Sequence, residues 1–511
     1  MRFFDEMRNE FTKKENLLQI AWVGALFSIS ALLLFYNTFR YSMPLGYGGL
    51  YALMAEEIAA GNFAIPVSVS YYGPGGIPFA YPPLAFYMAA ALLKLDISVI
   101  TILRLLPPLL SLLSLAPLYL LAKDQSDSSF AAGLTVLYAA CSPSLYVMHV
   151  WSAGMVRALA FLFMLCGLYA LYRALRDERL SFASLAGLFL GLTTLTHLFY
   201  ALVFALWAAS LFLINIRRLF AWKIFASTAM IALVCVTPWV FLMARRYGLE
   251  IFLNAFSSHD NAAFMEIVGQ PDAIFSWFFG KLFALTSPLP ALILIVCGLV
   301  YLIVKRRFSV PLALVFFALL LSGEGDRFIA LLGAILFGFG GMALTRLKIG
   351  GTAARPVLFL FGGAAALQTL FFGFQEIRNT LPLLNEYTFE TAKYVRANMS
   401  PSSRYLFVTG QAEAEWFPYL LRREPFVSKW GSEWLGTYYE QRALQMAVSN
   451  CRDAQSLECL KRLDIKFSSE DFLITKRSEK RLMNELESSP SCERIAAFGG
   501  YIIWQAQCLN Q

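Results

Sequence analysis

The sequence predicts a mainly α-helical, polytopic membrane protein with about eleven transmembrane helices and a C-terminal extracytoplasmic α/β domain. Three observations support this fold class. Hydrophobic residues make up 58% of the 511 residues and charged residues only 15%, which is too apolar for a soluble globule. Long apolar runs fill residues 17–375, whereas residues 376–511 have the composition of a soluble domain. Basic residues also cluster at alternate ends of the apolar runs.

The first apolar run, residues 17–36, follows a mixed-charge segment at 1–16. It is long enough to cross about 30 Å of hydrocarbon, and no small-residue cleavage site follows it. We therefore interpret it as a retained span after a cytoplasmic N-terminus. Similar runs predict further spans at 98–121, 130–146, 157–175, 181–197, 198–216, 222–243, 288–304, 309–322, 328–345 and 354–374.

The net charge of +8 is distributed as in a membrane protein, not as in a nucleic-acid-binding protein. In membrane proteins, the positively charged loops lie on the cytoplasmic side. An odd number of crossings then predicts a plasma-membrane protein with a cytoplasmic N-terminus and the C-terminal domain outside. The clusters that fix this topology are Lys13, Lys14, Lys123, Arg173, Arg176, Arg179, Arg217, Arg218, Lys223, Lys305–Arg307, Arg346 and Lys348.

Four cysteines lie in the soluble part: Cys451, Cys459, Cys492 and Cys508. An even number of cysteines in an oxidising compartment favours two disulfides. The most economical pairs are Cys451 with Cys459 and Cys492 with Cys508, although other pairings stay open. A zinc site is the rival interpretation, but the spacings are wide and this part contains no Cys-x-x-Cys pair and no histidine.

The pattern of residues 376–511 predicts mixed α/β structure. Residues 388–398 and 457–463 have helical spacing, 404–409 is a short β-rich run, and 494–504 holds a strand candidate around two glycines. About 135 residues are enough for a domain that folds independently.

The long first outer loop, residues 37–97, is too rich in aromatic, Gly and Pro residues to be one helix. Within it, the run from Tyr47 to Gly61 has helical spacing and ends in glycine. The sequence Phe79-Ala-Tyr-Pro-Pro-Leu-Ala-Phe-Tyr87 then enters another helix, which we place against the outer face up to residue 95 because it is too short to span.

These motifs resemble the first outer loop of GT-C glycosyltransferases, such as the protein mannosyltransferases and aminoarabinose transferases, which use polyprenyl-phosphate sugars. Ser142-Pro143 with Ser152-Ala-Gly-Met-Val-Arg157 is similar to their second outer loop, and Ser322-Gly-Glu-Gly-Asp-Arg327 to a late one. The resemblance implies a carboxylate that activates the acceptor, and basic side chains or a metal that compensate the carrier phosphate. The usual first-loop Asp is not found, because Tyr47, Gly48 and Gly49 occupy its place.

The candidate site residues are taken from the predicted outer segments. Each also has a structural interpretation: glutamates on an amphipathic helix, arginines that reach lipid headgroups, histidines as polar anchors and aromatic residues of an interfacial belt. No cofactor is firmly implied, and a divalent metal stays open. The candidates are Glu57, Asp260, Glu324 and Asp326 for catalysis, Arg157, Arg245 and Arg327 for the donor phosphate, and Tyr47, Tyr51, Tyr81, Pro82, Pro83 and His149 for the substrate loop.

The leading functional hypothesis is a membrane glycosyltransferase that moves a sugar from a polyprenyl-phosphate carrier to an unknown acceptor at the outer face. The expected partners are that carrier, the lipid bilayer and the acceptor, and no nucleic acid. Two alternatives stay open: a catalytically silent relative that binds a lipid-linked sugar, and a transporter or flippase of a lipid-linked glycan. Walker, Rossmann, His-Glu-x-x-His and nucleophile-elbow motifs are not found.

Overall fold

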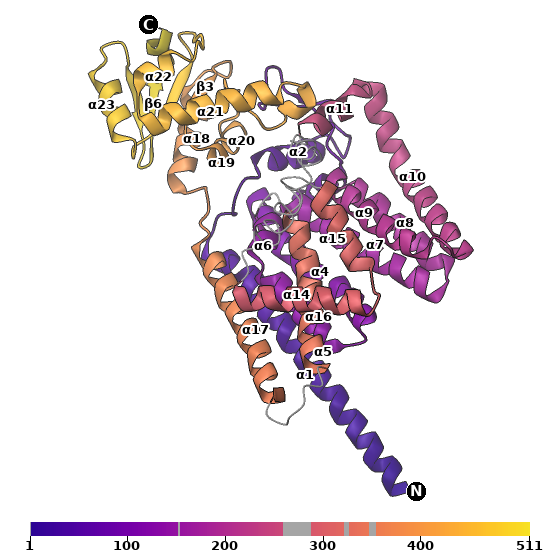
Figure 1. Ribbon diagram of the computed structural model, residues 1–511. Coiled ribbons are helices and arrows are strands. Elements are labelled where there is room, and N and C mark those ends of the chain that lie inside the picture. Colours follow the sequence, from indigo (N-terminus) through magenta and orange to yellow (C-terminus); the bar gives the residue numbers. More distant parts are fainter. Residues whose placement is uncertain (1, 152–153, 259–287, 321–325, 347–353, 511) are drawn as a thin grey trace, which may run out of the picture.

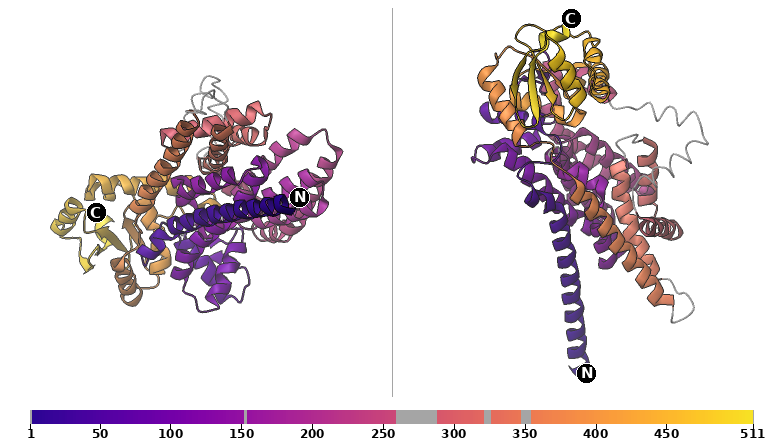
Figure 2. Two further views of the ribbon diagram at one scale, coloured as in Figure 1. Left: turned by 90° about the horizontal axis from the view of Figure 1, so that it is seen from below. Right: turned by 90° about the vertical axis from the view of Figure 1, so that its left-hand side faces the viewer.

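The computed structural model describes residues 2–151, 154–258, 288–320, 326–346 and 354–510 (Figure 1). A bundle of helices forms the larger body. A smaller α/β unit, residues 386–510, is called the C-terminal segment below. In Figure 2 this segment lies at one end of the bundle, and the N-terminus lies at the opposite end. The long apolar runs form helices because a chain in lipid must satisfy its backbone polar groups internally.

The helices of the larger body follow the apolar runs of the sequence. They are α1 Arg2–Arg40, α2 Gly49–Ala60, α3 Leu84–Leu93, α4 Val99–Ser126, α5 Ser129–Cys141, α6 Pro143–Val150, α7 Gly154–Asp177, α8 Leu180–Thr194, α9 Leu198–Asn215, α10 Leu219–Tyr247, α11 Glu250–Ser257, α14 Leu289–Val304, α15 Ser309–Leu320, α16 Asp326–Arg346 and α17 Ala354–Asn379. The first outer loop adds a short antiparallel pair, β1 Ser68–Val69 and β2 Ile77–Pro78.

The predicted number of eleven spans is not confirmed. Among the residues that the structure describes, six helices are long and apolar enough to cross a membrane, or seven if one bent pair counts as a span. Several predicted spans correspond to shorter helices. For example, α8 has 15 residues and α14 has 16, at or below the lower end of the range that crosses a bilayer.

The predicted span 130–146 is not continuous, because α5 and α6 meet at a bend of 65°. Ser142 adopts an extended conformation and Pro143 is the first residue of α6. Proline has no backbone N–H and disfavours helical geometry in the residue before it, so the helix breaks at this point. The bend places the end of α6 close to the start of α7.

Close contacts between small residues hold the bundle together. A Cβ atom on Gly298 of α14 would lie 2.0 Å from the Leu336 carbonyl oxygen of α16, and one on Gly340 of α16 would lie 1.9 Å from the Leu294 oxygen of α14. Only glycine permits this approach of the two backbones. Within its apolar window, 89% of α16 is buried but only 22% of α10, so α16 is a core helix and α10 is peripheral.

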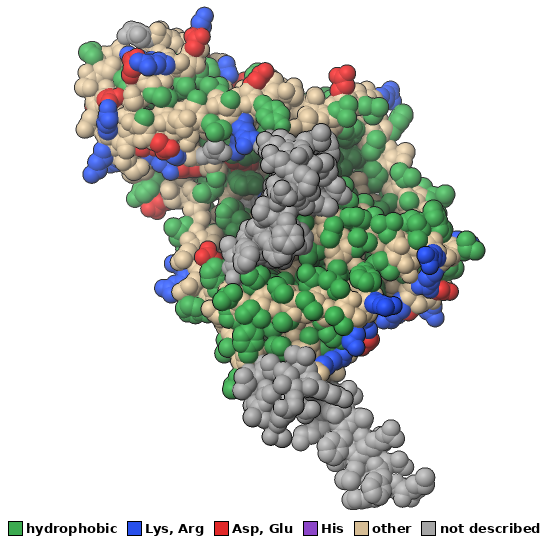
Figure 3. All heavy atoms as spheres, in the orientation of Figure 1, with side chains coloured by type: hydrophobic (Ala, Val, Ile, Leu, Met, Phe, Trp, Pro, Cys, Tyr) green, Lys and Arg blue, Asp and Glu red, His purple; other side chains and the backbone are tan. Residues whose placement is uncertain are grey.

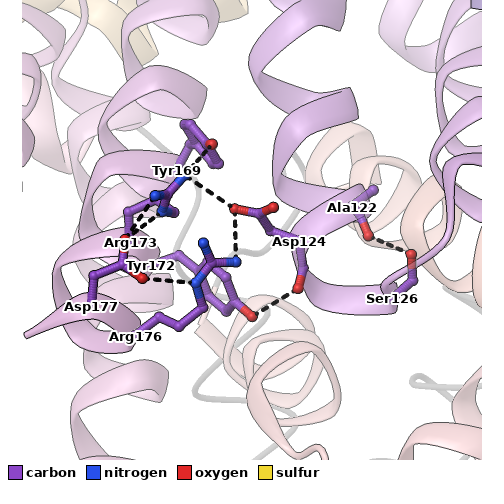
Figure 4. A network of polar contacts seen from close by, with 8 residues as sticks. All are labelled: Ala122, Asp124, Ser126, Tyr169, Tyr172, Arg173, Arg176 and Asp177. Atoms are coloured by element: carbon purple, nitrogen blue, oxygen red, sulfur yellow. Dashed lines mark hydrogen bonds and ion pairs between the residues drawn. The ribbon is translucent and has the colours of Figure 1, made fainter. Parts of the chain in front are cut away.

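Hydrophobic side chains cover the described surface of the bundle in the view of Figure 3, and charged side chains gather on the C-terminal segment and at the far ends of the helices. At the far end of α4 and α7, Asp124 forms an ion pair with Arg176 at 3.0 Å, and Arg173 forms one with Asp177 at 2.8 Å (Figure 4). The Tyr172 hydroxyl donates to the Asp124 carbonyl. This network joins the ends of the two helices.

The C-terminal segment contains a four-stranded sheet of order β3-β4-β6-β5, in which β3 and β4 are parallel and the other pairs antiparallel. Cys451 is joined to Cys459 and Cys492 to Cys508. The predicted helix 388–398 and strand 404–409 correspond to α18 and β3. The elements are α18 Glu386–Asn398, β3 Tyr405–Val408, α19 Gln411–Ala414, α20 Phe417–Leu421, η1 Ser432–Leu435, α21 Tyr438–Ala454, α22 Leu457–Lys461, β4 Phe472–Lys476, α23 Lys480–Ser488, β5 Arg494–Ala497, β6 Tyr501–Gln505 and η2 Ala506–Asn510.

Candidate functional site

Two arginines from different helices meet at one methionine. Arg157 lies near the start of α7 and Arg327 near the start of α16, and each directs a guanidinium Nη1 atom at Met148 Sδ of α6, at 3.5 and 3.2 Å. Arg327 is only 2% exposed. Two like charges that share one contact atom repel each other, and the low dielectric of a buried site strengthens that repulsion. The structure therefore brings two cationic groups from different helices to one side chain.

Aromatic rings hold the two guanidinium groups in place. The Cζ atom of Arg157 lies 5.6 Å from the centre of the Tyr47 ring. The Cζ atom of Arg327 lies 5.3 Å from the Phe199 ring and 5.7 Å from the Tyr200 ring. At these distances the π faces attract the cations and restrict their orientation. The sequence motifs predicted both arginines and Tyr47, and the structure brings the three together.

His149, a predicted substrate-loop residue, is buried beneath this cluster. Its Nδ1 atom lies 2.9 Å from the Leu145 carbonyl oxygen and its Nε2 atom 2.7 Å from the Tyr200 hydroxyl. The ring also stacks on Phe161. Nδ1 therefore donates to the carbonyl and Nε2 accepts from the hydroxyl, so both nitrogens are engaged and His149 orients the Tyr200 ring that covers Arg327.

The tyrosines of the first outer loop continue the aromatic cluster toward the C-terminal segment. The hydroxyls of Tyr51 and Tyr81 are 3.0 Å apart. The Tyr81 ring also meets the ring of Trp434, a residue of η1, with centroids 5.8 Å apart. The buried prolines Pro82 and Pro83 follow Tyr81 and lead into α3, so they fix the point at which the loop becomes helical.

The two glutamates of α2 point to different neighbours. Glu56 accepts a hydrogen bond from the Tyr419 hydroxyl at 2.6 Å and pairs with Arg422, both from the C-terminal segment. Glu57 Oε1 accepts the backbone N–H of Ser70 at 3.1 Å. Burial raises the pKa of Glu57. Glu57, a predicted catalytic residue, thus fastens the loop near the C-terminal end of α2.

The remaining predicted residues divide into two groups. Arg245 is exposed near the end of α10, and its neighbour Arg246 donates to the Ile65 carbonyl of the first outer loop. Asp260 and Glu324 lie outside the described residues. Asp326 is the first residue of α16, directly before Arg327, and its side chain is not described. In the described part of the chain, no group of three His, Cys, Asp or Glu side chains could hold a metal ion.

A residue that sequence reasoning missed completes the first outer loop. Glu415, in the C-terminal segment, accepts three backbone N–H groups at the start of α2: those of Gly48 and Gly49 at 2.8 Å and that of Leu50 at 2.7 Å. The neighbouring Trp416 donates its indole N–H to the Gly46 carbonyl at 2.8 Å. The glycine pair was the available signal, because adjacent glycines often mark a close approach of two backbones.

A cavity of about 450 Å³ lies beside this site and not within it. It is lined by the start of α4 at Ile100 and by Lys393, Arg396 and Tyr419 of the C-terminal segment. Arg396 also donates to the carbonyls of Tyr419 and Leu420. The cavity therefore belongs to the junction between the bundle and the C-terminal segment.

Comparisons with known proteins give a consistent result. The family model described as dolichyl-phosphate-mannose-protein mannosyltransferase matches residues 80–241, a segment that contains Tyr81, His149, Arg157 and Tyr200. A comparison with curated protein sequences gave no match. The similarity to solved structures extends over almost the whole chain.

ArnT from Cupriavidus metallidurans, solved with undecaprenyl phosphate, is 14% identical, with a TM-score of 0.54 over 95% of this chain and 98% of that one. AglB from Archaeoglobus fulgidus, solved with an inhibitory peptide and a dolichol-phosphate, is 12% identical, with a TM-score of 0.59 over 95% and 74%. The arabinofuranosyltransferase AftD from Mycobacteria is 14% identical, with a TM-score of 0.60 over 95% and 40%. The chain therefore has the GT-C fold of membrane glycosyltransferases, as its loop motifs predicted.

Proposed function

We propose that this protein transfers a sugar from a polyprenyl-phosphate carrier to an acceptor at the outer face of the plasma membrane. The observation that carries the proposal is the convergence of Arg157 and Arg327 on Met148. Similar folds occur in proteins solved with undecaprenyl phosphate or dolichol-phosphate. The proposal keeps the predicted topology, with a cytoplasmic N-terminus and an extracytoplasmic C-terminal segment.

The two arginines suit the leaving group of this reaction. As the bond between the sugar anomeric carbon and the phosphate oxygen breaks, negative charge grows on that oxygen. Guanidinium groups that are already oriented stabilise this charge without further reorganisation, and they match the geometry of phosphate oxygens. We assign Arg157 and Arg327 to the donor phosphate. We assign Arg245, which is exposed at the end of α10, to contacts with lipid headgroups.

The acceptor must lose a proton as its oxygen or nitrogen attacks the anomeric carbon. We propose that Asp326 accepts this proton, because Asp326 directly precedes Arg327 at the start of α16. The products are then a glycosylated acceptor, a protonated carboxylate and polyprenyl phosphate. Glu57, Asp260 and Glu324 remain the other candidates for this step, and a divalent ion remains a candidate partner of the phosphate.

The aromatic cluster supports recognition of the sugar. Tyr47 lies against Arg157, and the Tyr51 hydroxyl meets that of Tyr81. The Tyr81 ring in turn meets that of Trp434 from the C-terminal segment. Flat aromatic faces with hydroxyl groups provide both apolar contact and hydrogen bonds. We propose that these side chains form the walls against which the sugar ring lies.

A catalytically silent protein that binds a lipid-linked sugar is the second candidate. It is favoured by one observation, which is that the first outer loop has Tyr47, Gly48 and Gly49 where GT-C glycosyltransferases usually have an acidic residue. Such a protein would bind the donor through the same two arginines. It would release no polyprenyl phosphate.

The test measures release of polyprenyl phosphate from radiolabelled donors by protein reconstituted in lipid, with membrane extract as the source of acceptor. We expect Arg157→Gln and Arg327→Gln each to lower kcat/KM on the order of 10²-fold, because each removes one charge that stabilises the leaving group. Arg245→Gln is the matched control and should retain activity. If no donor releases polyprenyl phosphate although the protein still binds it, the silent protein is favoured. If Arg157→Gln and Arg327→Gln both keep the activity of the wild type and of Arg245→Gln, the arginine site is excluded.

A further inference from the structure

The start of α2 is held by the C-terminal segment and not by its own sequence. The first N–H groups of a helix have no partner within the helix, and a local Ser, Thr, Asp or Asn commonly caps them. In α2 the cap position is Gly48, which has no side chain to offer. The Glu415 carboxylate takes that place, with one oxygen accepting from Gly48 and Gly49 and the other from Leu50.

Two further contacts fix the same stretch of chain. Trp416 donates its indole N–H to the Gly46 carbonyl, and the Tyr72 hydroxyl donates to the Glu415 carbonyl at 2.7 Å. Glu415 is 2% exposed and Trp416 is fully buried. Residues 46, 48, 49 and 50 of the first outer loop are therefore clamped by two adjacent residues of the C-terminal segment, out of contact with water.

The glycine at position 49 makes this contact sterically feasible. A Cβ atom there would lie 2.7 Å from the Tyr72 hydroxyl oxygen, 2.9 Å from the Glu415 carbonyl oxygen and 3.0 Å from Trp416 Cα. Two of these are backbone atoms of the C-terminal segment, so an added methyl group would push the whole segment away. Gly49 thus sets how closely the segment approaches α2.

Three of the clamped residues, 48–50, lie between the two tyrosines of the proposed donor site. Tyr47 directly precedes Gly48 and covers Arg157. Tyr51 directly follows Leu50, and its hydroxyl meets that of Tyr81. A shift of the clamped backbone would carry both side chains with it, and small misplacements in a site of this kind have large effects on rate.

We infer that Glu415 is a positioning residue of the donor site, which holds the start of α2 so that Tyr47 lies over Arg157 and Tyr51 meets Tyr81. This inference rests on the proposed function for the identity of the donor. Glu415 is not itself a candidate base, because both carboxylate oxygens accept N–H groups and the side chain is buried. The donor site is therefore shared between the bundle and the C-terminal segment.

The experiment compares Glu415→Gln with Glu424→Gln in the full-length, lipid-reconstituted protein. Glu424 is a matched control, because its carboxylate also accepts a backbone N–H of the first outer loop, that of Gly75 at 3.1 Å, but this contact is exposed and lies more than 20 residues after Tyr51. A glutamine at 415 can offer only one accepting oxygen, and its NH₂ group would face an N–H donor. Two readouts are needed: hydrogen exchange of peptides covering residues 46–52, and the Kd for polyprenyl phosphate.

We expect Glu415→Gln to raise exchange in residues 46–52 about tenfold and to weaken the Kd by about tenfold, since one lost charged hydrogen bond has this order of effect. Glu424→Gln should leave the exchange and the Kd unchanged. Glu415→Asp keeps a carboxylate and should change both by less than Glu415→Gln does. Wild-type exchange and wild-type Kd in Glu415→Gln would overturn the inference.

A second variant, Gly49→Ala, covers the case in which Glu415→Gln fails to fold. It keeps every N–H group and the carboxylate but widens the contact, and it should weaken the Kd in the same way. Lower thermal stability with an unchanged Kd in both variants would reduce Glu415 to a purely structural role and reject the inference. If the wild-type protein itself neither binds nor releases polyprenyl phosphate, the proposed function fails, and the exchange of residues 46–52 still decides whether the clamp exists.

Discussion

Helix α2 contacts the C-terminal segment at both ends, and the two contacts are built differently. At its start, the buried Glu415 carboxylate accepts three backbone N–H groups. Near its end, Glu56 pairs with Arg422, and the two side chains are 32% and 25% exposed. Water and salt screen the second contact, whereas the first is protected from both. The difference teaches that the buried contact determines where α2 lies and that the half-exposed pair adds little.

Removal of the buried carboxylate should give the largest effect. Glu415→Ala leaves three N–H groups at the start of α2 without their acceptor, and each unsatisfied buried group costs roughly 1–3 kcal/mol. We expect the free energy of unfolding to fall by about 3 kcal/mol or more. Thermal unfolding of the detergent-solubilised full chain measures this. A melting temperature equal to that of the wild type would show that water enters and replaces the carboxylate.

The pH dependence of stability should show an intermediate effect. Desolvation by burial raises the pKa of Glu415 from 4.5 to about 7, although its three N–H partners oppose the shift. The folded state therefore binds a proton more tightly than the unfolded state does. Burial thus favours the protonated side chain, so stability falls as the pH rises from about 4.5 to 7, and the ionised carboxylate that accepts three N–H groups is the form present above about pH 7.

Melting temperatures from pH 5 to pH 8 test this sign. Stability of the wild-type protein should fall between pH 5 and 7, and in Glu415→Gln the slope should be smaller by on the order of 1 kcal/mol per pH unit. Some slope should remain, because burial also raises the pKa values of Glu433 and Glu479 to about 7. Identical slopes in the two proteins would contradict a raised pKa at Glu415.

The half-exposed contact should show the smallest effect. Glu56→Gln removes the ion pair with Arg422 but keeps an oxygen that accepts the Tyr419 hydroxyl. We expect a loss of stability of less than about 1 kcal/mol, because surface ion pairs contribute little. The melting temperature of the wild type and the variant should converge further in 0.5–1 M salt, roughly where the Debye length falls to a few ångströms. A loss as large as that of Glu415→Ala would remove the distinction between the two ends of α2.

The sequence predicted much of the helical bundle, because long apolar runs must be helical in lipid. It predicted one continuous helix over residues 130–146, which is wrong. Hydropathy is uniform there, but Ser142 and Pro143 break the helix. The predicted number of eleven spans is not confirmed for a related reason. Hydropathy does not distinguish a helix long enough to cross the membrane from a shorter apolar helix such as α8, which has 15 residues.

The candidate site was predictable where its residues lie in compact motifs. Arg157, Arg327, Tyr47 and Tyr81 were all found in this way. Trp434 and Glu415 were not, because their partners are in the first outer loop, hundreds of residues earlier, and no local periodicity reports such a contact. Buried polar pairs of this kind emerge only once the two parts of the chain are placed side by side.

The distance along the chain between the two halves of the clamp bears on how the protein is made. The N–H groups of residues 48–50 and the Glu415 carboxylate are separated by 365 to 367 positions. Chains are synthesised from the N-terminus, and contacts between distant residues form late. The start of α2 must therefore remain without this carboxylate while more than 300 further residues are translated. A ribosome that stalls before residue 415 leaves a chain that has its bundle helices but not the carboxylate that caps α2.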